Sequence, residues 1–198
     1  NIGSEKRTKY GIVGSQVNLT YRIESYTTAG QILISEQTLK DAGSIVKISG
    51  QKQVKPKGVK EPLTIYEVSG IAGFYNLYLP REEEFFFPLA EEIPIQYALL
   101  DGKNISDTLF RGSLVELSAK GAKVRADNLG EDNLPSGLTN LKFNLLTSNI
   151  PPEVSEDIYA KVLEKLAQKG SFYIRFTSIP PAVQIRLDAL YQSISARG

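Results

Sequence analysis

The stretch that decides the fold of the first part of this chain is Tyr10–Glu24, with the sequence YGIVGSQVNLTYRIE. The apolar run Tyr10–Val13 predicts a short β-strand. Gly14-Ser15 then offers a turn and an N-cap, and the following residues predict a helix that reaches about Tyr26. A strand that leads through a glycine turn into a helix indicates a mixed α and β domain.

Two polar residues of this helix, Asn18 and Arg22, lie four positions apart. Residues with this spacing share one face of a helix. The amide of Asn18 both donates and accepts hydrogen bonds, and the guanidinium of Arg22 is a permanently charged fork that suits phosphate oxygens. Together they can hold a sugar oxygen and a phosphate. The alternative is a solvated polar face on which Arg22 pairs with a nearby acid.

Strands and helices alternate through the remainder of this first part. Gln31–Ile34 predicts a strand, Ser35 an N-cap for a second helix, and Gly43 the end of that helix. Ile45–Ile48 and Leu63–Val68 predict two more strands, separated by a basic loop. This order of elements predicts an α/β or α+β fold.

A junction is expected at residues 71–92, where the acidic run Glu82–Glu84 meets the apolar run Phe85–Phe87. Three exposed phenylalanines are costly in water, so at least one of them should dock on a neighbouring surface. The sequence therefore predicts a first domain at residues 1–70, a linker at 71–92 and a second domain at 93–198.

The second domain is mostly β-like and ends in a helix. Short apolar or alternating runs recur with turn signals between them, which is typical of a small β-barrel. Residues 157–166 fit either a strand or a helix by spacing alone. The strand candidates are residues 93–100, 113–126 (two runs around a turn), 140–147 and 171–179, with a hairpin signal at 101–104 and an apolar helical stripe of Val183, Leu187, Leu190 and Ile194.

The composition excludes several kinds of chemistry. The chain contains no Cys, which rules out disulfides and thiol catalysis, and no His, the commonest general base and metal ligand. The net charge of +1 implies no general attraction to nucleic acid, and no apolar run reaches the length of a membrane span. The chain does not begin with Met and shows no signal peptide, so a fragment of a longer protein is expected.

The segments GSEKRTKYGIVGSQVNLTYRIES, GQILISEQT and KPKGVKEPLTIYEV resemble, in order and spacing, the C-terminal half of a class III nucleotide cyclase catalytic domain, which is ferredoxin-like. The resemblance covers residues 1 to about 70. It implies that the ribose 3′-hydroxyl of ATP attacks the α-phosphate, giving cyclic AMP and pyrophosphate. It assigns Asn18 to the ribose, Arg22 to the charge that develops on the α-phosphate, and Lys57 and Lys60 to substrate phosphates.

The chain departs from this family pattern at two positions. Gly11 stands where the family places Asp, Thr or Ser to read the base, so ATP rests on family frequency and GTP stays open. Val59 stands where a second lysine is expected.

The resemblance also implies an incomplete site. The family's ligands for two Mg²⁺ or Mn²⁺ ions belong to the preceding half of the domain and are absent from this chain. The fragment alone is therefore expected to be inactive. The family is dimeric, and its Asn and Arg face the metal ligands of the other subunit, so a homodimer is expected.

The segments FRGSLVELSAKGAKVRADN and DIYAKVLEKLAQKGSFYIRFTSIPPAVQIRLDALY resemble a PilZ domain, a six-stranded barrel with a C-terminal helix that in many members binds cyclic di-GMP. The resemblance makes residues 157–166 a strand. It marks Arg81, Ser118 and Gly121 as candidate ligand contacts. However, Phe85 stands in place of the second arginine of the R-x-x-x-R motif, and Glu116 in place of the Asp or Asn of the second motif.

Three hypotheses follow for the whole chain, which is predicted to be α+β. It is part of a nucleotide cyclase with an attached PilZ-like domain; or the barrel senses cyclic di-GMP and controls the cyclase; or a degenerate barrel serves only for dimer or partner contact, with Ser118–Gly121 a turn between strands. The missing arginine favours the third hypothesis over the second. The combination of resemblances implies a bacterial cytoplasmic signalling protein with a nucleoside triphosphate substrate and no nucleic-acid partner.

Overall fold

The structure, a computed structural model, divides the chain into two compact units, Asn1–Arg81 and Glu82–Gly198. Each unit is described by itself. The residues that the structure describes are 2–4, 7–9, 11–28, 30–56, 61–80, 83–101, 104–106, 108–127, 134–146 and 156–196.

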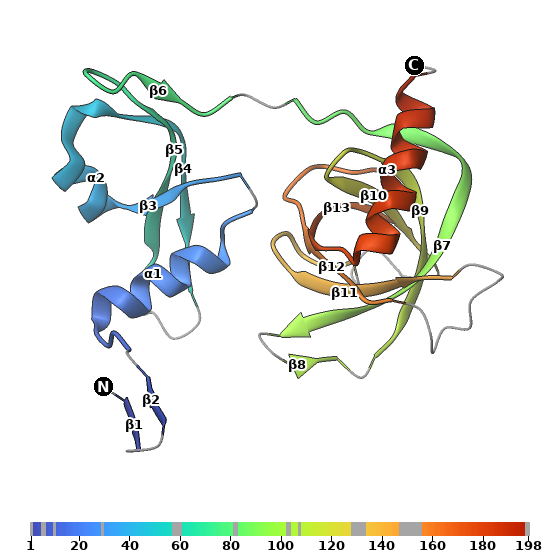
Figure 1. The fold of residues 1–198 in the computed structure, drawn as a ribbon, viewed down its shortest axis with the longest axis horizontal. Helices are drawn as coiled ribbons and strands as arrows, with labels where there is room; N and C mark the ends of the chain where they lie inside the picture. The colour runs from blue at the N-terminus through green and yellow to red at the C-terminus, as the bar shows by residue number, and fades with distance from the viewer. Residues whose placement is uncertain are drawn as a thin grey trace. The chain divides into compact units, whose positions relative to one another are not determined.

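The first unit is built on a small antiparallel sheet with the strand order β3-β5-β4, and β6 also pairs with β5 (Figure 1). Two helices, α1 and α2, accompany this sheet, and a separate β1–β2 hairpin precedes α1. The bounds are β1 Ile2–Ser4, β2 Arg7–Lys9, α1 Ser15–Ser25, β3 Leu33–Ser35, α2 Glu36–Ala42, a 3-10 turn Gly43–Ile45, β4 Val46–Val54, β5 Leu63–Ile71 and β6 Leu77–Tyr78.

The core of the first unit is small. Ile23 of α1 packs against Val54 and Ile65 of the sheet, and partly buried residues surround these three. One stripe of α1 faces the sheet, since Leu19 and Ile23 are four residues apart and both join this cluster. The burial of this stripe, rather than the short helix's own propensity, holds α1 in place.

The elements predicted from the sequence are largely present in the first unit, with two corrections. The predicted strand at 10–13 is wrong for the described residues Gly11–Val13, which are irregular. No strand pairs with them, and Ile12 and Val13 are more than 80% exposed. Helix α1 begins at Ser15 with Gly14 in the capping position and no side-chain cap, so Ser15 is not the N-cap.

The second helix follows the prediction. The Ser35 hydroxyl accepts a hydrogen bond from the Thr38 N–H at 3.1 Å, which caps α2. Gly43 ends the helix with φ +70°, a left-handed conformation that glycine adopts without strain.

The second unit is a closed antiparallel barrel of six strands, followed by helix α3 (Figure 1). The strands follow the cycle β7-β9-β10-β13-β12-β11, and the pairing of β11 with β7 closes it. This confirms the predicted barrel with a C-terminal helix, and residues 158–162 are a strand. The bounds are β7 Phe87–Asp101, β8 Asn104–Ile105, β9 Phe110–Leu117, β10 Gly121–Ala126, β11 Asn140–Leu145, β12 Ile158–Val162, β13 Ser171–Ser178 and α3 Pro181–Ser195.

The barrel encloses an apolar core that is much larger than that of the first unit. Inward side chains from every strand are almost fully buried, among them Leu114, Phe143 and Ile174 at 0% exposure. Helix α3 adds Val183 and Leu187 to this core, as its apolar stripe predicted. The β7–β8 hairpin is present where the sequence signalled it, with Leu100 opposite Ile105.

The stretch 71–92, expected as a junction, includes β6 and the first residues of β7. Phe86 and Phe87 make ring contacts with Tyr173 and Tyr191, whereas Phe85 is 61% exposed.

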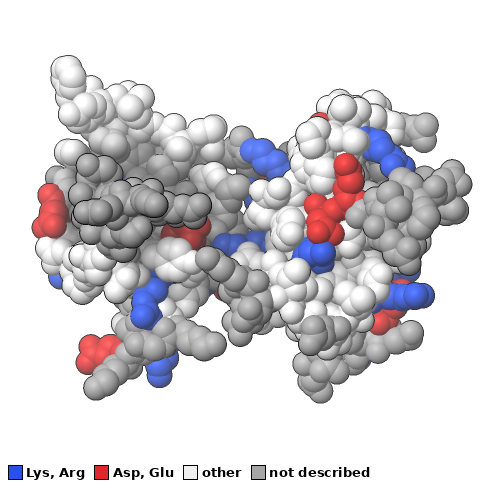
Figure 2. All heavy atoms as spheres, turned by 60° about the horizontal axis from the view of Figure 1, so that its bottom comes forward, with Lys and Arg blue, Asp and Glu red and all other residues white. Residues whose placement is uncertain are grey.

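Basic and acidic side chains are interspersed on the face shown in Figure 2. Within the part of the chain that the structure describes, no helix is long and apolar enough to cross a membrane.

Candidate functional sites

Helix α1 presents the first pair of candidate residues. Asn18 is exposed and Arg22 is half-buried, and the two lie one helical turn apart. The backbone supports this turn, because the Asn18 N–H donates to the Gly14 carbonyl at 3.0 Å and the Ser25 hydroxyl to the Arg22 carbonyl at 2.7 Å. The structure therefore brings the predicted pair onto a regular helix and keeps both side chains out of the core.

Another side of α1 borders a hollow of about 540 Å³. Its lining from α1 includes Gln16, Leu19 and Ile23, and the segment between α1 and β3, β3 itself and the start of α2 also contribute. At 100° per residue, the direction of Asn18 and Arg22 lies about a third of a turn away from this stripe. The candidate pair thus lies beside the stripe that faces the sheet and outside it.

Three predicted site residues lie outside the described residues: Lys57, Lys60 and Arg81. Their assignments stay predictions. Among the residues that the structure describes, no group of three or more carboxylates is arranged to hold a metal ion. The described residues do not fit a metal centre.

The second candidate site is the turn between β9 and β10, where Ser118 and Gly121 lie. The Ser118 N–H donates to the Gly121 carbonyl at 2.9 Å, which closes the turn. A Cβ added to Gly121 would stand 2.2 Å from the backbone oxygen of Ile174 on β13. Gly121 is therefore required by close strand packing, which is a structural reason for the glycine of this motif.

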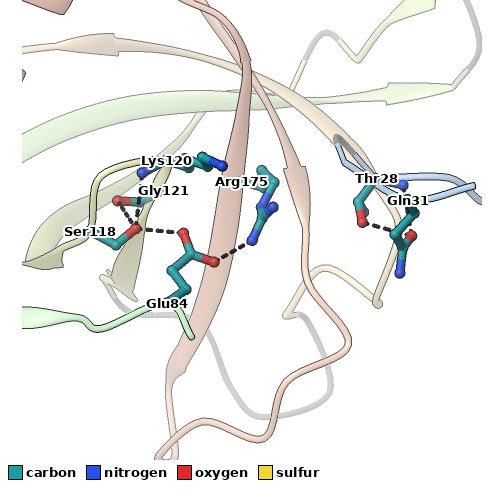
Figure 3. A network of polar contacts seen from close by, with 7 residues as sticks. All are labelled: Thr28, Gln31, Glu84, Ser118, Lys120, Gly121 and Arg175. Atoms are coloured by element: carbon teal, nitrogen blue, oxygen red, sulfur yellow. Dashed lines mark hydrogen bonds and ion pairs between the residues drawn. The ribbon is translucent and has the colours of Figure 1, made fainter. Parts of the chain in front are cut away.

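The Ser118 hydroxyl is bound within the chain (Figure 3). It is 3% exposed, lies 2.7 Å from Glu84 Oε1 and 3.1 Å from the Gly121 carbonyl oxygen, and accepts the Lys120 N–H at 3.3 Å. A hydroxyl has a single proton, and the shorter distance favours donation to Glu84. The second carboxylate oxygen of Glu84 pairs with the Arg175 guanidinium.

Glu116, which stands at the Asp/Asn position of the motif, is also engaged inside the unit. Its Oε1 lies 2.7 Å from Lys123 Nζ, and the side chains of Glu116 and Lys123 are 23% and 7% exposed. The hydrogen bond that Lys123 donates to Glu116 raises the pKa of Lys123 above its ordinary value, although burial acts in the other direction. The Glu116 carboxylate therefore holds a buried ammonium group in its charged state.

Aromatic contacts fix the segment that carries Glu84. Phe86 meets Tyr173 edge to face with ring centroids 4.8 Å apart, and Lys165 Nζ lies 4.3 Å from the centroid of each ring. In the next position Phe87 begins β7 and pairs with Leu117 of β9. Residues 83–87 are thus strapped to the outer surface of the barrel next to the Ser118 turn, and we call them the strap.

Sequence reasoning missed the partners in this site. It treated Glu84 only as part of an acidic run and gave no role to Arg175 or Lys123. The spacing of these residues along the chain carries no signal of contact, because β10 and β13 become neighbours only when the barrel closes.

Comparison with solved structures gives matches of two kinds. The guanylyl cyclase Cya2 is 64% identical, over 40% of this chain and 41% of that chain, with a TM-score of 0.38. The PilZ domain of Escherichia coli YcgR with c-di-GMP is 17% identical, over 60% of this chain and 94% of that chain, with a TM-score of 0.39. The PilZ domain of CeSA from a cellulose-synthesizing bacterium is 17% identical, over 54% and 96%, with a TM-score of 0.37.

The chain spans about two fifths of the length of the guanylyl cyclase. No family model and no curated protein sequence matches the chain.

Proposed function

We propose that this chain is part of a class III nucleotide cyclase, in which α1 supplies Asn18 and Arg22 to a nucleoside triphosphate site and the barrel is an attached domain. The observation that carries this proposal is the solvent-facing side of α1, where Asn18 is exposed and Arg22 half-buried, and neither belongs to the buried stripe of Leu19 and Ile23. The 64% identity to a guanylyl cyclase supports it.

In the proposed reaction the ribose 3′-oxygen forms a bond to the α-phosphorus while the bond from the α-phosphorus to the bridging oxygen breaks and pyrophosphate leaves. Asn18 would fix the ribose through its amide. Arg22 would stabilise the negative charge that builds on the α-phosphate oxygens. A preorganised donor of this kind acts mainly in the transition state. Mg²⁺ or Mn²⁺ would be held by residues other than those described here.

The test is cyclic nucleotide formation by the longest natural protein that contains this chain, with Arg22→Ala, Asn18→Ala and Gln16→Ala compared. Removing Arg22 should lower kcat by about 100-fold or more with little change in KM, in line with the loss of one transition-state donor. Gln16→Ala is the matched control, because Gln16 is an exposed residue on the other side of the same helix. Equal losses of kcat and of substrate affinity in the Arg22 variant would contradict the assigned role.

The same assay also shows which purine base the substrate carries. The sequence predicts ATP from family frequency, whereas the likeness to a guanylyl cyclase favours GTP. Gly11 offers no side chain to read either purine. Parallel measurements with ATP and GTP, by product identity, decide between cyclic AMP and cyclic GMP. We also propose that the chain by itself forms neither product and that the active protein is a homodimer.

A second proposal concerns the barrel: it acts as a contact domain and does not bind cyclic di-GMP. The observation that favours it is the internal use of both polar side chains of the motif, Glu116 by Lys123 and Ser118 by Glu84. A ligand would have to break these contacts before making its own. Calorimetry of the full chain with cyclic di-GMP should show no saturable binding, and tight binding would overturn this proposal in favour of a cyclic di-GMP sensor.

A further inference from the structure

Two hydrogen-bond donors converge on one carboxylate at the rim of the barrel (Figure 3). The Ser118 hydroxyl lies 2.7 Å from one oxygen of Glu84, and the Arg175 guanidinium pairs with the other. The side chains of Glu84 and Arg175 are only 17% and 18% exposed. Ser118 and Arg175 come from the β9–β10 turn and from β13, so the barrel itself holds the donors in position.

The donors lie on or beside the paired strands of the barrel, whereas the acceptor lies outside the strand ladders. The β9–β10 turn is held to β13 by a hydrogen bond, since the Phe176 N–H donates to the Lys120 carbonyl at 3.0 Å. Glu84, by contrast, lies in the irregular residues 83–86 that precede β7. It can therefore leave the site without breaking a strand ladder, which the donors cannot do.

A hydroxyl and a guanidinium that bind the two oxygens of one anion form a donor set that suits a phosphate as well as a carboxylate. We propose that Ser118 and Arg175 form an oxyanion-binding site that Glu84 fills from within the chain, so that Glu84 takes the place of a phosphate-bearing ligand and keeps the strap docked. This inference rests on the second proposal above, that the natural barrel binds no cyclic di-GMP.

Glu84 is then the residue that determines whether the barrel can bind a phosphate-bearing ligand. As long as its carboxylate occupies the site, an incoming phosphate meets a like charge and finds both donors engaged. With Glu84 removed, the Ser118 hydroxyl and the Arg175 guanidinium lose the carboxylate that they bind, while Ser118 keeps its contacts with Gly121 and Lys120. The barrel should then gain affinity for anions that the natural chain does not bind.

The test uses the full chain and two probes, inorganic pyrophosphate and cyclic di-GMP, titrated calorimetrically into the natural chain, Glu84→Ala and Glu83→Ala. Glu84→Ala should bind pyrophosphate about tenfold tighter or more, equivalent to about 1.4 kcal/mol. Glu83→Ala is the matched control, because it removes the same charge from an exposed neighbouring position. Adding Arg175→Ala to Glu84→Ala should abolish the gain.

The two probes distinguish a site that binds a free inorganic oxyanion from one that also binds the phosphates of a cyclic dinucleotide. Gain of pyrophosphate binding alone identifies a simple oxyanion site, and gain of both identifies a site that also accepts a cyclic dinucleotide; either outcome supports the inference. A folded Glu84→Ala chain that binds pyrophosphate no better than Glu83→Ala overturns it. Binding of cyclic di-GMP by the natural chain overturns the second proposal instead, so the two failures are distinguishable.

Glu84→Gln provides a second variant if the alanine variant does not fold. It removes the charge but keeps an acceptor for Ser118, and it should gain pyrophosphate affinity in the same direction. Hydrogen exchange on the natural chain is an independent measurement: a high concentration of pyrophosphate should speed exchange of the strap, residues 83–87, and leave β10 unchanged. Unchanged exchange in the strap would contradict the idea that an oxyanion and Glu84 compete.

Discussion

Replacing Glu116 tests whether this position of the barrel is structural. Glu116 is the ion-pair partner of Lys123, whose side chain is 7% exposed on β10. The change Glu116→Ala leaves the ammonium group buried without its counter-charge. Breaking a buried pair by removing one partner typically costs about 3–5 kcal/mol, because the remaining charge is poorly solvated. Glu116 is itself 23% exposed, so we expect about 3 kcal/mol, the low end of that range.

Removing the other partner of the pair, Lys123, should lower the stability of the barrel less than removing Glu116. Lys123→Met removes the more buried partner and leaves a carboxylate that water can reach at the 23% exposed Glu116. The double variant Glu116→Leu with Lys123→Met replaces the pair by apolar groups, which is often neutral or stabilising. The expected order of stability is therefore the double variant close to the natural chain, then Lys123→Met, then Glu116→Ala.

The measurement must report on the barrel alone, since the chain has two units that can unfold separately. Hydrogen exchange of peptides from β9 and β10, followed as a function of urea, gives the free energy of opening for this region. A loss below about 1 kcal/mol in Glu116→Ala, the size of an exposed pair, would refute the reasoning.

The pH dependence gives a second check on the same pair. In the natural chain the pKa of Lys123 is raised, so its contribution is fully present below the unfolded pKa of about 10.4 and is lost as pH rises through the higher folded value. Without Glu116 the largest cause that raises the pKa of Lys123 is gone, burial still lowers this pKa and Tyr173 still raises it, so the pKa falls and deprotonation relieves part of the cost. The stability gap between the natural chain and Glu116→Ala should therefore narrow between neutral pH and pH 10, and a constant gap would contradict this account.

Two further pairs of substitutions test the packing of the barrel by the same exchange measurement. Gly121→Ala should destabilise by about 2–4 kcal/mol, since its Cβ would stand 2.2 Å from the backbone oxygen of Ile174. Gly137→Ala should cost less because its closest contact is the side-chain Cγ of Glu164 and not a backbone atom; equal costs would contradict the strand-packing explanation. Phe143→Ala should cost about 3–5 kcal/mol because Phe143 is fully buried, whereas Phe85→Ala at a 61% exposed site should cost well under 1 kcal/mol; a large loss at Phe85 would contradict this account of the packing.

The elements that the sequence predicted best are those with strong local signals. Ser35 caps α2 and Gly43 ends it because capping depends on residues three or four positions away. The apolar stripe of α3 predicted its burial for the same reason. The strand at Gly11–Val13 failed because a strand requires a partner, and no residue type within the strand specifies that partner.

The geometry of the barrel site depends on contacts that are distant in the sequence. The motif in the sequence identified Ser118 and Gly121 as candidate residues, but it did not predict which residues they contact. Glu84 reaches Ser118 across 34 positions and Arg175 across 91. Such contacts exist only after the barrel closes, so single-sequence reasoning could predict the turn and the fold but not the internal carboxylate.

The two candidate sites differ in what their polar groups do in the folded chain, and this difference supports opposite roles. On α1, Asn18 is exposed and Arg22 half-buried, and neither side chain belongs to the core of the first unit. In the barrel, the Ser118 hydroxyl and the Arg175 guanidinium already bind Glu84. Removing a partner from a largely buried pair costs about 3 kcal/mol or more, and each 1.4 kcal/mol is a tenfold loss of affinity. A ligand that displaced Glu84 without replacing its contacts would thus begin about 100-fold weaker, which favours contact over ligand binding at the barrel.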